Sequence, residues 1–255
     1  MLPVAFERAA PKAWWDPKFD SAILEGQYQS SVFPQLRLRF RFALLYILLC
    51  SVVWMIYFLT VAKLNSLVSI AFGLCIIFCL ITVWLTYSKF YENRAHLVTF
   101  CVASITCLLS LLFVSVSGRS FSALGHFATC IEVILLIYTL MPLPLWQCVS
   151  ISVLYSIFFE ALHFTFQSFY YSGSHEDSTA PYRVIVVRCL LHLCVHMVGL
   201  HVLVMNVVRM RCTFMKVGQN LLIRRQLEME KQLKEKMIHS VMPPKVADML
   251  MKEGS

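Results

Sequence analysis

The chain has 255 residues, of which 59% are hydrophobic and only 14% are charged, and its formal net charge is +8. Soluble globular domains carry about 25% charged residues, so this composition, with a mean hydropathy of +0.71, argues against a water-soluble fold. The apolar residues occur in runs near the ~20 residues needed to cross a bilayer. We therefore predict an all-α membrane protein.

The chain begins with a polar segment, residues 1–41, that precedes the first apolar run. Its start, "MLPVAFERAAPKAWWDPKFD", has prolines, acids and tryptophans where a secretory signal would have a basic region and then an apolar one. We expect this segment to be retained and cytosolic. It ends in the basic stretch "RLRFR", which contains Arg37, Arg39 and Arg41.

Apolar segments at a length suited to the ~30 Å hydrocarbon core follow in close succession. The six predicted spans are 42–62, 67–87, 97–117, 121–141, 143–166 and 182–208. Tight connectors such as "SKFYENRAH" and "PLP" separate them and favour an up-and-down bundle of antiparallel neighbours. Basic residues concentrate before the first span, between the second and third, and after the sixth. This distribution predicts cytosolic N- and C-termini.

Ionisable residues inside predicted spans are functional candidates by default. Glu132 of the fourth span and His192 of the sixth have similar depths, so we expect them to meet near the midplane. Glu160 of the fifth span and Arg188 of the sixth both lie near the outer end, where we expect an ion pair. His196 is one turn from His192 and on the same face.

These polar residues admit several interpretations. Two histidines four residues apart can bind haem or a metal, and a ligand or lipid pocket or a proton path are further alternatives. We favour polar contacts that hold the helices together. Scarce glycine and prolines at span ends argue against a transporter. We identify no pore loop or charged ring of the kind a channel would need.

The sixth span continues without a breaker into a charged segment, residues 209–241, that has no proline and only Gly218. The segment is rich in helix formers, and an apolar seam recurs along it at three- and four-residue steps. We predict that the sixth helix continues as a cytosolic, coiled-coil-like signalling helix, with a solvated juxtamembrane helix as the alternative. The main seam residues are Leu222, Leu227, Leu233 and Met237.

The last residues, 242–255, have two prolines directly after Met242. Pro243 disfavours helix at the residue before it, and Pro244 extends the break, so the signalling helix should end at a fixed corner. The sequence "HSVMPPKVADML" resembles the segment that leads into the catalytic domain of class III nucleotide cyclases. The matching residues are Ser240, Val241, Met242, Pro243, Val246, Ala247 and Leu250.

Together with six spans and a basic juxtamembrane helix, this ending makes the layout similar to the first half of a membrane adenylyl cyclase. The stretch "FERAAPKAWWDPKFDSAILE" is similar to the type-nine group of these enzymes. The resemblance implies an enzyme of the plasma membrane that converts ATP to cyclic AMP and pyrophosphate, using two Mg²⁺ ions. The implied partners are a second six-helix bundle, a second signalling helix, cyclase catalytic domains, G-protein subunits and membrane lipid, with no nucleic acid.

The resemblance also implies that these 255 residues are inactive alone. After Val241 the only acids are Asp248 and Glu253, whereas cyclisation needs two carboxylates to hold two Mg²⁺ ions. We therefore expect no catalytic, cofactor-binding or metal residues in this segment. The alternatives are a non-enzymatic six-span channel, transporter or scaffold, and a six-span sensor for another effector such as a kinase.

Overall fold

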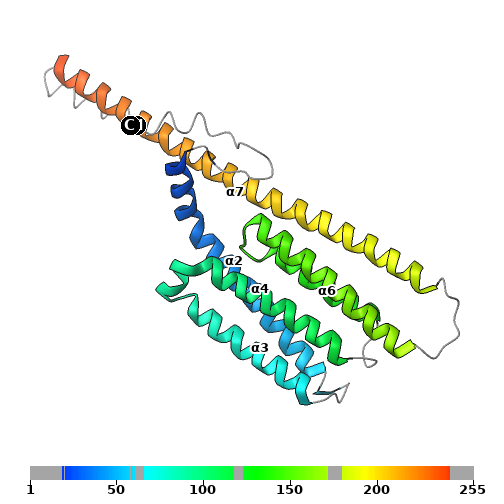
Figure 1. Cartoon of the computed structure of the whole chain (residues 1–255). Helices are drawn as coiled ribbons and strands as arrows, with labels where there is room; N and C mark the ends of the chain where they lie inside the picture. Colours follow the sequence, from blue (N-terminus) through cyan, green and yellow to red (C-terminus); the bar gives the residue numbers. More distant parts are fainter. Residues whose placement is uncertain are drawn as a thin grey trace. The chain divides into compact units, whose positions relative to one another are not determined.

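The computed structural model describes residues 19, 21–57, 59–60, 66–117, 123–171 and 180–241. Within them the chain is helical, and no strand occurs (Figure 1). The six helices are α2 (Ala22–Tyr57), α3 (Ser66–Leu85), α4 (Lys89–Ser117), α5 (Ala123–Thr139), α6 (Leu145–Tyr171) and α7 (Ala180–Val241). The predicted all-α class is confirmed.

Apolar helices compatible with membrane spans dominate the described chain. Four helical stretches are long and apolar enough to cross a bilayer: Ala22–Tyr57, Lys89–Val116, Leu145–Thr165 and Arg183–Ile238. Two further apolar stretches, Ile70–Leu85 and Leu124–Thr139, are shorter. The arrangement as six spans therefore stays a prediction.

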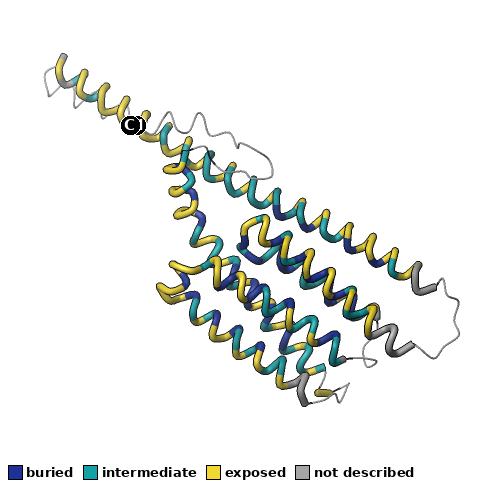
Figure 2. Tube along the Cα trace, in the orientation of Figure 1, coloured by how far each residue is buried: buried dark blue, intermediate teal, exposed yellow. Residues whose placement is uncertain are grey.

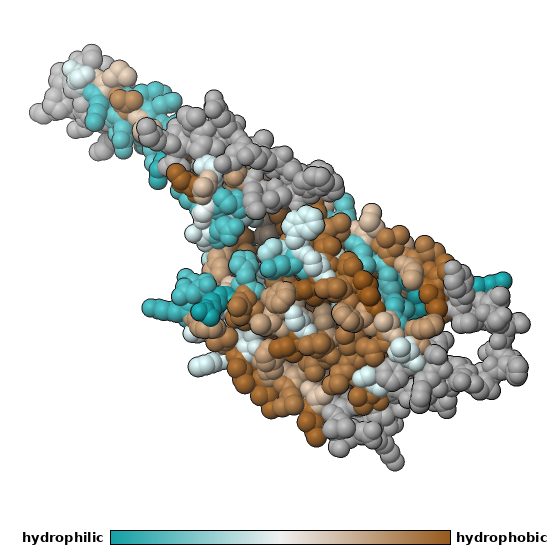
Figure 3. Space-filling model, viewed as in Figure 1, coloured by the Kyte–Doolittle hydropathy of each residue, from teal (hydrophilic) through white to brown (hydrophobic). Residues whose placement is uncertain are grey.

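Apolar side chains on the outer faces of these helices are exposed, as lipid contact requires. On α3 they include Leu74, Ile77 and Trp84. Figure 2 shows both exposed and buried residues along the helices of the bundle, and Figure 3 shows hydrophobic residues across the visible face of the bundle. A helix exposed on its apolar side is unstable in water but suited to a hydrocarbon environment.

The chain divides into two compact units, residues 31–206 and residues 1–30 with 207–255. We call the first the bundle and the described part of the second the rod unit. Helix α2 crosses the division and contains Pro34, which has no N–H to donate to the carbonyl of Ser30. The boundary predicted at residue 41 is not a helix boundary, because α2 begins at Ala22.

The bundle is packed around α4, which contacts α3, α5 and α6, while α5 also contacts α6. Its core contains fully buried Phe40, Ile134 and Phe159. Ala43 and Ala103 are also fully buried, and such small residues let helix backbones approach closely. Close packing matters here because lipid is as apolar as the core, so helix association depends on van der Waals contact and hydrogen bonds.

The connector predicted between the second and third spans is itself largely helical. Ser88 Oγ accepts a hydrogen bond from the Phe90 amide at 3.2 Å and so caps the start of α4. The buried ring of Tyr91 stacks on Phe40 at 5.5 Å. Non-helical backbone angles at Arg94 then kink α4. The predicted connector "SKFYENRAH" is therefore helical from Lys89 on, because the cap and this aromatic contact stabilise a helical turn there.

Two arginines of α2 contact the ends of two other helices. Both Nε and Nη2 of Arg39 donate to the carbonyl of Thr139 at the end of α5, with Nε at 2.9 Å. Arg41 Nε donates to Thr86 Oγ1 at 2.9 Å just after α3, and its guanidinium lies 3.8 Å from the centre of the Tyr87 ring. A cation at a helix C-terminus is favourable because the last carbonyls carry partial negative charge. We call Arg39 and Arg41 the basic collar. Their contacts place the C-terminal ends of α3 and α5 beside the start of the first apolar run.

Candidate functional site

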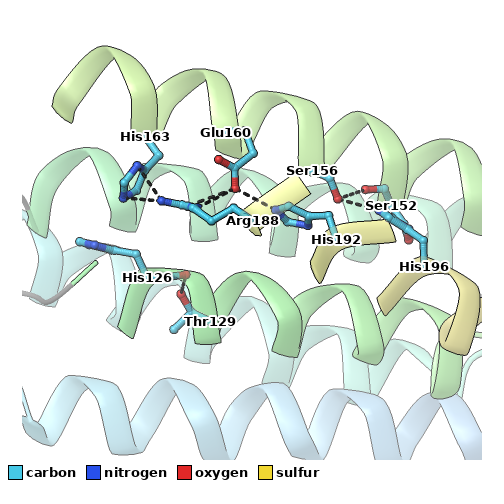
Figure 4. A network of polar contacts seen from close by, with 9 residues as sticks. All are labelled: His126, Thr129, Ser152, Ser156, Glu160, His163, Arg188, His192 and His196. Atoms are coloured by element: carbon cyan, nitrogen blue, oxygen red, sulfur yellow. Dashed lines mark hydrogen bonds and ion pairs between the residues drawn. The ribbon is translucent and has the colours of Figure 1, made fainter. Parts of the chain in front are cut away.

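The candidate site in the bundle is a polar network between α6 and α7. On α6, Ser152, Ser156, Glu160 and His163 recur every three or four residues and so share one face. On α7, Arg188, His192 and His196 recur every four residues and share a face in the same way. Figure 4 shows these two polar stripes facing each other, with His126 and Thr129 of α5 nearby.

The centre of the network is the predicted ion pair, which is confirmed. Arg188 Nη2 lies 3.1 Å from Glu160 Oε1, and Arg188 Nε donates to the same oxygen at 3.2 Å. The two side chains are 10% and 23% exposed, respectively. A charged group at this depth is costly unless it is paired. Each of the two residues can therefore be buried only because the other neutralises its charge.

Arg188 also has neutral partners on two helices. Its Nη1 lies 2.9 Å from both ring nitrogens of His163, whose unprotonated nitrogen accepts the hydrogen bond. The guanidinium stands 5.2 Å from the ring centre of Phe127 on α5 and 5.7 Å from that of Phe159 on α6. Aromatic faces stabilise a desolvated cation. Arg188 therefore connects α7 to both neighbouring helices.

The two histidines of α7 continue the network along the helix. His192 Nε2 donates to Glu160 Oε1 at 2.9 Å. His196 Nε2 lies 2.8 Å from Ser156 Oγ, and its Nδ1 lies 3.1 Å from the Tyr138 hydroxyl of α5. One ring nitrogen of a neutral histidine donates and the other accepts, so His196 links α5 and α6 in either tautomer.

A metal at these histidines has no support in the residues that the structure describes. Among them, no group of three or more His, Cys, Asp or Glu could hold a metal ion. The ring nitrogens of His196 are both engaged in hydrogen bonds to hydroxyls, and His192 Nε2 is engaged with Glu160. These contacts favour the interpretation that the polar residues hold helices together.

The expected meeting of Glu132 and His192 was wrong. Glu132 Oε1 instead accepts hydrogen bonds from the Tyr46 hydroxyl at 2.7 Å and from the Cys50 thiol at 3.2 Å, both on α2. Depth along the helices was not enough to predict the contact, because the direction around α5 also matters. Glu132 lies five residues after Phe127, which contacts His192, and is therefore turned about 140° away around the helix.

A second polar site lies in the rod unit and was not predicted. Arg211 of α7 donates to both carboxylate oxygens of Glu25, at 2.8 and 2.9 Å. The guanidinium lies 4.9 Å from the ring centre of Phe19 and 4.5 Å from that of Tyr28. Phe214 packs against both rings, at 6.0 and 5.4 Å. We call these five residues the clamp.

The clamp shifts the acidity of Glu25, which lies outside the predicted spans. Burial by itself would raise the pKa of the Glu25 carboxyl, but hydrogen bonds from Arg211, from the Phe19 amide and from Gln29 together lower that pKa to about 2. The carboxylate is therefore charged at neutral pH, and the bidentate pair is of the strong, geometrically specific kind. The clamp connects Phe19 and the first turns of α2 to Arg211 and Phe214 of α7.

The residues predicted for the rod and hinge are only partly described. Helix α7 is unbroken to Val241, with Leu222 half-buried and Leu227, Leu233 and Met237 exposed. Ser240 Oγ donates to the Met237 carbonyl at 2.9 Å. Pro243, Pro244, Val246 and Ala247 lie outside the described residues. Pairing of the seam with another helix stays a prediction.

Sequence comparison identifies relatives of the whole chain. No protein-family model matches it. The chain is 38% identical over 275 residues to "Adenylate cyclase type 9" of Xenopus laevis, covering 99% of this chain and 21% of that protein. It is 37% identical over 270 residues to "Adenylate cyclase type 9" of Gallus gallus, covering 99% of this chain and 20% of that protein.

These matches and the apolar helices define the class: the chain is a membrane protein homologous to adenylate cyclases. More particularly, it is similar to adenylate cyclase type 9 along nearly its whole length. The chain spans about a fifth of the length of the curated relatives it matches. The similarity suggested by the two ends of the sequence is thus confirmed.

Proposed function

We propose that this chain is the membrane-anchoring and regulatory region of an adenylyl cyclase that converts ATP to cyclic AMP and pyrophosphate. Homology to adenylate cyclase type 9 over 99% of the chain supports the proposal. By this proposal the region crosses the plasma membrane six times, with both termini in the cytosol. The basic collar supports that orientation, because Arg39 and Arg41 lie at the end of the bundle where the first apolar run begins.

Cyclisation itself takes place in catalytic domains outside this segment, which hold ATP and two Mg²⁺ ions. The length of the relatives, about five times the matched region, leaves room for such domains. G-protein subunits act on those domains. The chain alone is then inactive, and its contribution is to organise how two catalytic domains meet.

The observation that carries this proposal is the continuity of α7. One helix of 62 residues runs from Ala180 to Val241, and its one proline, Pro181, lies in the first turn. The helix therefore joins the polar network at Arg188 to the predicted corner at Pro243. A continuous helix transmits rotation and axial shift, which a flexible linker would lose. The clamp at Arg211 holds the base of the rod. We infer that the rod pairs with a second signalling helix and sets the register of the catalytic domains.

Site-specific photo-crosslinking tests the pairing. A benzophenone amino acid at Leu233, on the predicted seam, should capture a second helix of the complete enzyme in native membranes. The same probe at Glu228, which is also exposed but lies about 140° around the helix from Leu233, is the matched control. Equal capture at both positions, or none at Leu233 while the enzyme is inserted and active, would refute a specific pair.

A second experiment tests the hinge. Replacing Pro243 and Pro244 with alanine in the complete enzyme removes the predicted corner and lets helix continue. Basal or stimulated formation of cyclic AMP should change while membrane insertion stays intact. Unchanged activity would show that the corner has no role in coupling.

A further inference from the structure

A cavity of about 280 Å³ lies among α2, α3, α4 and α5, within the bundle. It is separate from the network between α6 and α7. The side chains that matter here are Tyr46, Cys50 and Glu132 around one part of its wall and Trp54, Phe72 and Phe113 around another. Small-molecule sites are concave, mostly apolar and furnished with a few convergent polar groups, and this cavity has that composition.

Among the residues that the structure describes, Glu132 is the only acid that lines the cavity, and its partners are neutral. Tyr46 and Cys50 both donate to Oε1. Among the described residues no Lys, Arg or His pairs with Glu132, whereas Glu160 has Arg188. No described residue donates a hydrogen bond to Glu132 Oε2. A carboxylate at membrane depth with neutral partners alone has a strong electrostatic preference for a cation.

The hydroxyls that line the cavity already have partners in the protein. Ser110 is 2.7 Å from the Tyr155 hydroxyl, and Thr129 donates to the His126 carbonyl at 2.8 Å. Ser51 Oγ lies 3.5 Å from Cys75 Sγ. The polar group of the wall that lacks a charged partner is therefore the Glu132 carboxylate. The polar end of a ligand is then selected by its charge.

The aromatic part of the wall gives the ligand its apolar end. The Trp54 and Phe113 ring centres lie 5.7 Å apart, and those of Phe72 and Phe113 lie 6.2 Å apart. Trp54 follows Tyr46 by two helical turns, which is about 12 Å along α2. A molecule that spans the cavity thus has a charged end at Glu132 and an apolar body about as long as an eight-carbon chain.

We propose that this cavity is a binding site for a small lipophilic amine, with its ammonium on Glu132 and its hydrocarbon body against Trp54, Phe72 and Phe113. The volume suits about nine non-hydrogen atoms at the ~30 Å³ that a water-sized group occupies in a liquid. Such a cation partitions into the bilayer and reaches the cavity from the lipid phase. The aromatic faces add a second attraction for a cationic ligand whose head shifts toward them.

Three probes that share an eight-carbon chain but differ in the charge of the head group test the site. The probes are n-octylammonium, 1-octanol and octanoate, each added to the full chain in nanodiscs of zwitterionic lipid. The readout is the rate at which N-ethylmaleimide alkylates Cys50, which lines the cavity, measured by mass spectrometry of its peptide. The exposed Cys101 is the internal control for partitioning of the reagent.

We expect n-octylammonium at ten times its Kd to slow alkylation of Cys50 about tenfold and to leave Cys101 unchanged. Octanol should protect less at the same membrane concentration, and octanoate should not protect. Equal protection by all three probes would identify a non-selective apolar cavity and overturn the proposal. Stronger protection by octanoate, or none by the amine, would also overturn it.

Variants separate charge from shape. Glu132→Gln should reduce protection by the amine to the level seen with octanol. Ala71→Phe, which fills the cavity at another wall residue, should remove protection by both probes. Leu74→Phe is the matched control, because Leu74 is on the same helix but exposed to lipid, and it should behave as the original chain. Full protection by the amine in Glu132→Gln would refute the charge pairing. If a variant fails to fold, protection of Cys50 in the unmodified chain still decides whether the amine binds. The readout does not involve cyclic AMP, so its outcome is independent of the proposed cyclase role.

Discussion

The close approach of Gly199 on α7 to Tyr138 on α5 predicts that Gly199→Ala is destabilising. A Cβ built on Gly199 of α7 would lie 2.4, 2.8 and 3.0 Å from Cδ2, Cγ and Cε2 of Tyr138 on α5. Ordinary contacts between carbon atoms are ~3.5–4.0 Å, so ring and helix would have to separate by about 1 Å. Tyr138 is only 1% exposed and its hydroxyl contacts His196, so the ring has little freedom to move. Overpacking of this kind costs about 1–3 kcal/mol.

Gly73→Ala on α3 is the matched control, because nothing lies within 4 Å of a Cβ at that position. Alanine is favoured over glycine in a helix interior by about 0.5–1 kcal/mol, so Gly73→Ala should be neutral or slightly stabilising. Unfolding of each variant in mixed micelles, followed by circular dichroism, compares the two. The reasoning is refuted if Gly199→Ala is as stable as Gly73→Ala.

Two further predictions concern the charged pairs. Glu160→Gln leaves the cation of Arg188 buried without a counter-charge and should lower the free energy of unfolding by about 3–5 kcal/mol, whereas changing both residues to leucine should recover most of the loss. A loss below 1 kcal/mol for Glu160→Gln in the same micelle assay would contradict the pair's role. The pKa of Glu25 is about 2 in the folded chain, below its ordinary value of 4.5, so the clamp is fully favoured above pH 4.5 and weakens as pH falls towards 2. Hydrogen exchange around Arg211 should speed up over that window in the original chain but not in Glu25→Gln, and a flat profile in the original chain would exclude the clamp.

Hydropathy and helix formers were enough to predict which parts of the chain are helical, because an apolar run of about 20 residues has the length of a helix that crosses the membrane. The absence of proline in residues 209–241 predicted that the last apolar helix continues, and α7 is unbroken to Val241. Its coiled-coil pairing stays a prediction. The ends of helices were less predictable. Residues 22–41 read as polar, yet α2 begins at Ala22 and includes Pro34, although a proline inside a helix removes one backbone hydrogen bond.

The candidate site was predictable where depth and helical spacing agreed. Glu160 and Arg188 have matching depths and face each other, so their ion pair was correctly predicted. Glu132 and His192 also have matching depths, but they point away from one another, which a depth argument does not capture. The polar stripe of Ser152, Ser156 and Glu160 at four-residue steps was a detectable signal for the network.

The clamp had a weaker signal in the sequence. Glu25 and Arg211 are 186 residues apart in the chain, and no local pattern connects residues so distant. Only their common position beside apolar runs, one before the first predicted span and one after the sixth, places both on the same predicted side of the membrane. The contact depends on tertiary packing.

The most direct test of the proposed coupling inserts helix-forming residues into the rod between Arg225 and Gln226, after the clamp and before the seam residue Leu227. The same insertion is made in the predicted partner helix of the complete enzyme. Two residues rotate the seam by about 200°, whereas seven residues restore the heptad register. We predict that formation of cyclic AMP is largely lost with two residues and retained with seven, at equal membrane insertion. Equal activity of the two forms would contradict a rod that sets the register of the catalytic domains.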